Sequence, residues 1–209
     1  MEISASRVKE LRDRSGAPMM DCKAALVEAR GDLERAHKIL RQRGQATAAR
    51  RSTRATSEGA VGSYIHGGGR LGVLVEVNCE SDFVARTEDF KTLVKDLAMH
   101  IAASEPRFVD RAEVAEGVLN EEREIYREQA LATGKPDAVV EKIVAGKMEK
   151  FYQEFCLMEQ PFVRDPNLTV RDLIHSVIAR VGENVRVRRF ARFVLGRNEA
   201  GRGTGNTSR

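Results

Sequence analysis

The sequence predicts an α+β protein in which an N-terminal three-helix bundle precedes a three-stranded antiparallel sheet packed with helices and a helical hairpin. Two apolar runs, GAVGSYIH (59–66) and LGVLVEVNC (71–79), flank a glycine-rich turn. They predict a β-hairpin, because glycine supplies the positive φ angles that tight turns need. A third alternating run, VRVRRFARFVL (185–195), is expected to pair with this hairpin as the third strand.

Residues 1–44 predict three short helices with recognisable ends. Ser4 and Asp32 suit the N-caps of the first and third helices, because their side-chain oxygens accept hydrogen bonds from unpaired helix amides. Pro18 suits the first position of the second helix, since its missing amide is not needed there. A glycine is expected to end each helix in turn, at Gly16, Gly31 and Gly44. So small a bundle has little core and leaves much of its apolar surface exposed.

The remainder divides into a linker, a larger domain and a tail. Residues 45–57 (QATAARRSTRATS) are small and basic with no apolar face, so they predict a linker, with a solvated helix as the alternative. An α+β core domain is expected over 58–195. Residues 196–209, rich in glycine and polar side chains, are expected to be disordered.

The helices of the core domain follow from apolar spacing. Apolar residues recur at helical intervals over 90–101. Two further helices, over 117–132 and 137–159, flank the turn ATGKP and predict a helical hairpin. The last helix begins after its N-cap, Thr169, and ends at Gly182.

The segment between the second strand and the next helix carries an acid and a large aromatic, Asp82 and Phe83. Phe83 precedes Phe90 by seven residues, so one unbroken helix would place both rings on the core face. However, Thr87 followed by two acids is typical of a new helix start. A restart at Thr87 would leave residues 81–86 as a separate turn that projects Phe83 outward. Periodicity alone favours the core position, and both readings stay open.

Composition and charge limit the class to which the protein can belong. The chain has 209 residues, of which 42% are hydrophobic and 32% charged, as in globular proteins. The net charge of +4 comes from arginines in 41–57 and in the tail, and the few aromatics form no base-stacking cluster, so we expect no direct nucleic-acid binding. We also expect no membrane span and no signal peptide, and therefore a cytoplasmic protein. The three cysteines predict buried thiols, with an intermolecular disulfide as the alternative.

Two short segments match catalytic or nucleotide-binding motifs in spacing but lack the neighbouring elements that those motifs require. GGGRLG (67–72) has the dinucleotide-binding spacing, but a strand follows it where a helix is required. His66 and the glycines after it resemble an oxyanion element, yet the chain contains no GxSxG nucleophile. There is no phosphate-binding loop, and the four histidines lie in separate elements. We therefore expect no enzymatic activity, no catalytic residue, no cofactor and no metal ligand.

Met19 and Met20 begin the second helix of the bundle. Adjacent helical residues point about 100° apart, so a small bundle cannot bury both fully. Methionine is adaptable at binding surfaces, which favours a docking patch. Core packing of at least one of the two is slightly favoured by the sequence alone.

The segment NCESDFVARTEDF (78–90) closely resembles the NCxTDFVAxN signature of the bacterial elongation factor Ts family, guanine-nucleotide exchange factors for elongation factor Tu. The resemblance covers residues 1 to about 195. VKELRDRSGAPMMDCKAAL and GDLERAHKIL resemble the family's ubiquitin-associated-like (UBA-like) domain, and KFYQEFCLMEQPFV resembles its KFYxExCLLEQPF stretch. Ser81 and Thr87 stand where the family usually has threonine and asparagine, and the linker lacks the usual lysines.

The resemblance implies a function without catalytic residues. In the family, an Asp-Phe turn enters the GDP-bound GTPase beside its Mg²⁺ site and displaces groups that help to hold the metal. Asp82 and Phe83 match this Asp-Phe pair, which we call the wedge. Ser81 and Val84 match the residues that shape the turn around it.

The resemblance also implies how the chain binds and assembles. Arg12, Met19 and Met20 match positions that grip a helix of the partner's nucleotide domain. A single hairpin with one closing strand matches the short, dimeric family members, so a homodimer and a two-plus-two complex are expected. Two rivals remain: an adaptor that binds peptides or ubiquitin-like proteins through 1–44, and a nucleic-acid-binding protein.

Overall fold

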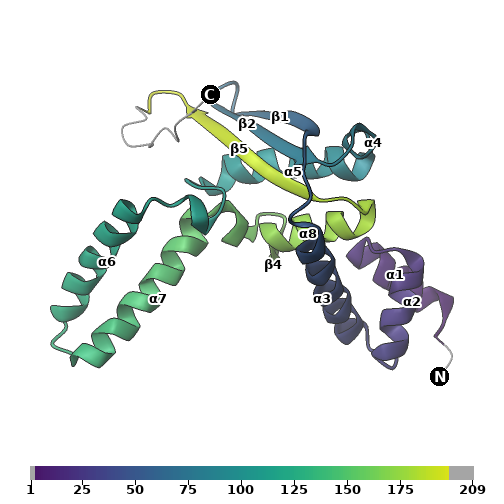
Figure 1. Ribbon diagram of the computed structural model, residues 1–209, viewed down its shortest axis with the longest axis horizontal. Coiled ribbons are helices and arrows are strands. Elements are labelled where there is room, and N and C mark those ends of the chain that lie inside the picture. The colour runs from purple at the N-terminus through teal and green to yellow at the C-terminus, as the bar shows by residue number, and fades with distance from the viewer. Residues whose placement is uncertain (1–2, 198–209) are drawn as a thin grey trace.

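A computed structural model describes residues 3–197 of the chain. Its centre is a three-stranded antiparallel sheet in the order β1-β2-β5 (Figure 1). The strands are β1 (Glu58–His66), β2 (Leu71–Cys79) and β5 (Val185–Val194). The predicted α+β fold, with its hairpin and its closing third strand, is confirmed.

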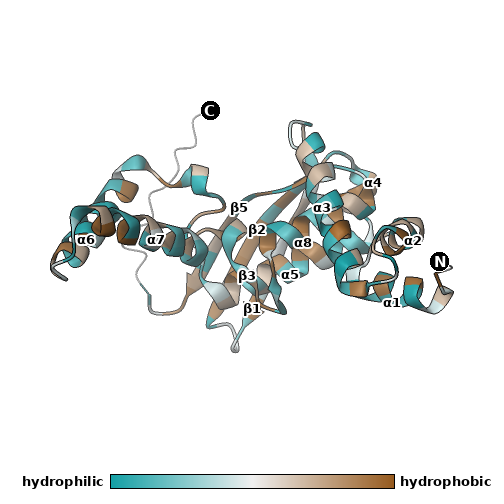
Figure 2. Cartoon of the chain, turned by 90° about the horizontal axis from the view of Figure 1, so that it is seen from below, coloured by the Kyte–Doolittle hydropathy of each residue, from teal (hydrophilic) through white to brown (hydrophobic). Residues whose placement is uncertain are grey.

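Helices cover one face of this sheet. They are α5 (Glu88–Ser104) and α8 (Val170–Val181), which lie in front of the sheet in Figure 2. Alternate β2 side chains pack against them, as the period of two requires, because successive side chains of a strand point to opposite faces. The buried set includes Val73, Val75, Val77, Cys79, Phe90, Leu93, Leu97, Ile101, Ile174 and Ile178.

The N-terminal bundle consists of α1 (Ala5–Ser15), α2 (Met19–Glu28) and α3 (Leu33–Arg51). The Ser4 side chain accepts a hydrogen bond from the Arg7 amide, and that of Asp32 accepts one from the Arg35 amide, so both predicted N-caps are present. Gly16 adopts the left-handed conformation expected of a helix end. The bundle buries a small core of its own: Val8, Leu11, Cys22, Ala25, Leu26, Ala29 and Ala36.

The predicted helix end at Gly44 is wrong, because α3 continues to Arg51. Glycine in a helix interior costs about 1 kcal/mol relative to alanine, and tertiary contacts outweigh that cost here. Gly44 is buried against the backbone of His175 in α8, and Ala48 is buried in the core of the sheet. Residues 45–51 therefore have an apolar contact face that the sequence pattern did not reveal, and only 52–57 of the expected linker are not helical.

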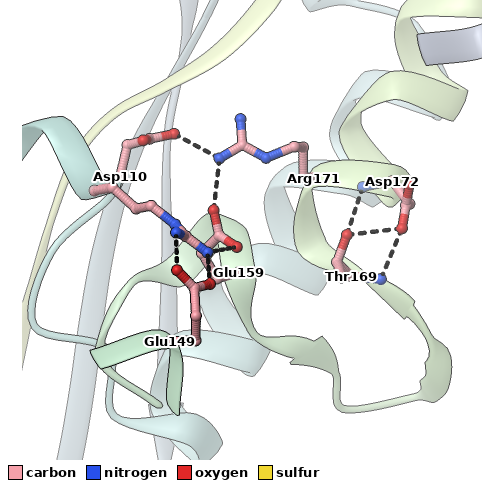
Figure 3. A network of polar contacts seen from close by, with 7 residues as sticks. Asp110, Glu149, Glu159, Thr169, Arg171 and Asp172 are labelled. Atoms are coloured by element: carbon pink, nitrogen blue, oxygen red, sulfur yellow. Dashed lines mark hydrogen bonds and ion pairs between the residues drawn. The ribbon is translucent and has the colours of Figure 1, made fainter. Parts of the chain in front are cut away.

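Polar contacts also join α3 to α8. Arg41 forms an ion pair with Asp172, and Gln45 Nε2 donates to the same carboxylate at 3.1 Å. Asp172 in turn accepts bonds from the Thr169 amide and hydroxyl, at 3.2 and 2.8 Å, in a capping box (Figure 3). The predicted N-cap at Thr169 is thus present, and its partner also anchors the last helix of the bundle.

The helical hairpin is formed by α6 (Glu116–Leu131) and α7 (Asp137–Phe155). The predicted second helix was too long, because Cys156 adopts an extended conformation with φ −98° and ψ 115°. There the Leu157 amide donates to the Phe108 carbonyl at 2.9 Å, a long-range contact that ends the helix. A short hairpin, β3 (Pro161–Phe162) and β4 (Asp165–Thr169), follows and was not predicted.

An ion-pair network fixes the root of this helical hairpin to the core (Figure 3). Arg111 bonds both carboxylate oxygens of Glu149 in α7, at 3.0 and 2.8 Å, and reaches Glu159 at 3.0 Å. Arg171 in α8 bonds Asp110 at 2.8 Å and Glu159 at 3.2 Å. Two arginines therefore share Glu159 and connect α7 to α8.

The three parts of the molecule lie in a row. Figures 1 and 2 both place the hairpin α6–α7 at one end, the bundle α1–α3 at the other, and the sheet with α5 and α8 between them. The short helix α4 (Asp82–Ala85) lies at the same end as the bundle in both views.

Cys22, Cys79 and Cys156 are buried free thiols, as expected. Burial raises the pKa of Cys79 and of Cys156 to about 11, which keeps both protonated at neutral pH. The expected disorder of 196–209 falls, from residue 198 onward, outside the described residues.

We expect the stability of the protein to fall as the pH is lowered from 7.5 to 5. His100 is fully buried: its Nδ1 accepts from the Val163 amide at 3.2 Å, so Nε2 donates to Gln160 Oε1 at 2.9 Å. Burial lowers the pKa of His100 in the folded state. Below the ordinary histidine pKa of about 6.5, the unfolded chain binds a proton that the folded chain does not, so acid favours unfolding.

Urea unfolding at pH 7.5 and pH 5 checks this expectation. The midpoint should be lower at pH 5, and the difference between the two pH values should shrink in His100→Gln, which cannot titrate. An equal difference in the variant and the wild type would show that His100 is not the group responsible.

Candidate functional site

The turn after β2 exposes the Phe83 side chain to solvent. Ser81 caps α4, its side chain accepting from the Val84 amide at 3.4 Å, and Thr87 caps α5 by accepting from the Phe90 amide at 3.3 Å. The helix therefore restarts at Thr87, which confirms one of the two readings, and the core position that periodicity favoured for Phe83 is wrong. Phe83 is 78% exposed, whereas Phe90 is fully buried. A ring this exposed contributes little to the core and is available to a partner.

The other residues of the turn have separate structural roles. Val84 is buried and fixes the turn to the core. Asp82 forms an ion pair with Arg86 at 2.7 Å, one helical turn along. Ser81 bonds the side chain of Glu183 through both its amide and its hydroxyl, at 2.9 and 2.6 Å.

Sequence reasoning missed Glu183, although the sheet register could have identified it. In the antiparallel pair β2–β5, Cys79 lies opposite Val185. Continuing that register by two residues beyond each strand places Ser81 opposite Glu183. The alternating pattern predicted that β5 pairs with the hairpin but not the register of that pairing, so no motif pointed to this contact.

The bundle presents the second expected surface. Met20 is 72% exposed and Met19 is 45% exposed, both in the first turn of α2. The slightly favoured reading, that at least one packs in the bundle core, is wrong, because Cys22, Ala25 and Leu26 already fill that face of the helix. Arg12 on α1 is also exposed. Met19 and Met20 therefore leave an adaptable apolar patch at the start of α2, and Arg12 adds an exposed cation on α1.

The helix α4 and the bundle helices α1 and α2 lie at the same end of the molecule (Figures 1 and 2). Within residues 3–197, no group of three or more His, Cys, Asp or Glu side chains is arranged to hold a metal ion. Over the same residues, no helix has the length and apolar character needed to cross a bilayer. Exposed apolar side chains at helix starts, as at Phe83 and Met20, are typical of surfaces that bind partner proteins.

Comparison with known proteins gives the family. The model of the family "Elongation factor TS" matches residues 23–197. Elongation factor Ts of Koribacter versatilis is 60% identical over 94% of this chain and 90% of the relative. That of Moorella thermoacetica is 60% identical over 93% and 96%, and that of Geobacter sulfurreducens is 57% identical over 94% and 91%. The chain therefore belongs to the elongation factor Ts family, the nucleotide exchange factors of translation elongation, and the resemblance noted in the sequence is confirmed.

Proposed function

We propose that this chain binds GDP-bound elongation factor Tu in the cytoplasm and promotes GDP release by disturbing the Mg²⁺ site of the GTPase. The observation that carries the proposal is the exposure of Phe83 on a turn that is otherwise anchored to the core. Family membership indicates the partner, and the exposed ring indicates which side chain acts on it.

The mechanism requires only differential binding. Mg²⁺ bridges phosphate oxygens and protein ligands, so disturbing its coordination shell weakens the hold on the nucleotide. Asp82 and Phe83 form the wedge, and Ser81 and Val84 fix its backbone. If the chain binds the metal-depleted GTPase more tightly, its binding lowers the affinity of the GTPase for GDP and Mg²⁺. By thermodynamic linkage, GDP and Mg²⁺ lower the affinity of the GTPase for the chain by the same factor.

We further propose that Arg12, Met19 and Met20 dock on a helix of the nucleotide domain of the GTPase. Their exposure, and their position at the same end of the molecule as α4, support this role. Docking would then bring Phe83 to the metal site in one orientation.

Release of labelled GDP from elongation factor Tu, with and without the chain, tests the proposal. Acceleration by the chain is the expected result, and its absence would refute the function. An adaptor would instead bind its target through residues 1–44 and be indifferent to Phe83. A nucleic-acid-binding protein would show affinity for nucleic acid that falls steeply with salt.

We also propose a homodimer, formed through the open face of the sheet. The face opposite α5 and α8 carries apolar side chains that are exposed in the single chain: Val61, Ile65, Leu74, Phe193 and Leu195. Cross-strand pairing makes the patch continuous, since Gly72 separates Ile65 from Phe193 across the sheet. A second copy would cover this patch, as burial of apolar surface favours.

Phe193→Glu is expected to give a monomer. The charge would have to be buried without a partner in the dimer, which is strongly unfavourable. Light scattering of the wild type at micromolar concentration should give about twice 23.2 kDa, and the variant about 23.2 kDa. Phe193→Leu, which keeps an apolar side chain, should remain dimeric. A monomeric wild type would rule out the dimer.

A further inference from the structure

Glu183, in the turn between α8 and β5, satisfies both donors at the start of the Phe83 turn. Its Oε2 accepts from the Ser81 amide at 2.9 Å, and its Oε1 accepts from the Ser81 hydroxyl at 2.6 Å. The same hydroxyl oxygen accepts from the Val84 amide at 3.4 Å. One carboxylate therefore determines where the backbone of α4 begins.

The neighbouring residues make the reciprocal contact. The Asn184 amide donates to Glu80 Oε1 at 2.6 Å, so each of the two turns supplies a carboxylate to an amide of the other. We call Glu80, Ser81, Glu183 and Asn184 the clasp. Its bonds continue the β2–β5 ladder past the last strand pair, with side-chain carboxylates in place of backbone carbonyls. Bonds to ionised acceptors are shorter and stronger than neutral ones.

The clasp also binds the segment that follows the N-terminal bundle. The Asn184 side chain, in a residue only 4% exposed, donates to the carbonyls of Arg54 and Ser52 at 2.9 and 3.4 Å. These carbonyls lie directly after α3, the last helix of the bundle. The segment that follows the N-terminal bundle and the turn that carries Phe83 are thus held at the same point of the core.

We propose that Glu183 is a positioning residue that fixes the direction of Phe83 for nucleotide exchange, an inference that rests on the proposed function of the ring. A side chain that is 78% exposed has little packing of its own to orient it. Its direction is set by backbone 81–84, which is held by Val84 on one side and by the clasp on the other. Preorganisation of this kind lowers the ordering cost of binding.

Glu183→Ala should therefore lower the maximal rate of GDP release from elongation factor Tu. We expect a decrease of about tenfold, the size that follows from losing hydrogen bonds to a charged group. The factor concentration at half-maximal rate should stay unchanged, because the Met19 and Met20 surface is intact. Hydrogen exchange at the Ser81 and Val84 amides should become faster, a local effect that general destabilisation would not restrict to this turn.

Glu113→Ala is the matched control. Glu113 also accepts a backbone amide bond, from Val109 at 3.0 Å, but three residues before the start of α6, the helix that lies at the other end of the molecule from α4 (Figure 1). Its loss should leave the maximal exchange rate unchanged. Ser81→Thr keeps the hydroxyl and should retain activity, while Ser81→Ala should resemble Glu183→Ala. The double variant should be little worse than either single one, because both remove the same contact.

The outcomes separate the inference from the function on which it depends. If Phe83→Ala slows exchange while Glu183→Ala and Ser81→Ala keep the wild-type maximal rate, the positioning role is wrong and the wedge stands. If Phe83→Ala itself exchanges at the wild-type rate, the proposed function fails instead. Should Glu183→Ala fail to fold, Glu183→Gln and Ser81→Ala, which remove less of the contact, decide the question by the same rate.

Discussion

Phe83→Ala is expected to abolish most of the acceleration of GDP release. The ring is the large apolar side chain that the α4 turn exposes, and central aromatic contacts typically contribute about 2–4 kcal/mol to a protein interface. If that energy is realised only with the metal-depleted GTPase, the maximal exchange rate should fall roughly 30- to 700-fold. Stopped-flow release of a fluorescent GDP analogue from elongation factor Tu, over a range of factor concentrations, measures the effect.

Two variants show whether the loss is specific to the wedge. Phe83→Leu keeps an apolar side chain without the ring, and its rate should lie between those of wild type and alanine. Met20→Asp places a charge on the docking surface, so it should raise the concentration needed for half-maximal rate while largely preserving the maximum. An alanine variant whose maximal rate equals that of the wild type would show that Phe83 does not act on the metal site.

The fold should be unaffected by Phe83→Ala. Since the side chain is 78% exposed, its removal leaves no cavity, and surface substitutions of this kind usually change stability by less than about 0.5 kcal/mol. Urea unfolding of the purified variant therefore separates loss of contact with the partner from loss of structure.

Sequence reasoning succeeded where the cause of a structural feature is local. Ser4, Thr87 and Thr169 each cap a helix through a side-chain bond to an amide three residues ahead, so the pattern that predicts the helix start also contains its partner. The left-handed glycines at 16 and 182 follow the same logic, because their conformation depends on the residue itself. The sheet was predictable because alternation of side chains marks a half-buried strand.

Sequence reasoning failed where distant contacts decide. Gly44 continues a helix because α8, more than 120 residues later, packs against it. The second helix of the hairpin stops at Phe155 because Leu157 bonds back to Phe108. The candidate site divides in the same way: the exposure of Phe83 followed from the restart at Thr87, one of two open readings, whereas Glu183 required knowledge of the sheet register.

Phe90→Ala is expected to have the opposite effect to Phe83→Ala, although the two residues are only seven apart. Phe90, in α5, is fully buried in the same core as Leu97 and Ile174. Truncating a buried phenylalanine leaves a cavity and typically costs about 3–5 kcal/mol of unfolding free energy. For a chain of 209 residues this corresponds to a fall in melting temperature of about 6–20 °C.

Calorimetry and urea unfolding, at one fixed protein concentration because a dimer would make stability depend on it, measure this loss. Phe90→Leu, which fills most of the volume, should lose less than half as much. The folded fraction of Phe90→Ala should still exchange GDP, because α4 is held separately by Ser81 and Val84. If Phe90→Ala were as stable as the wild type, Phe90 would not be a core residue. The assignment of a core role to Phe90 and a binding role to Phe83 would then be wrong.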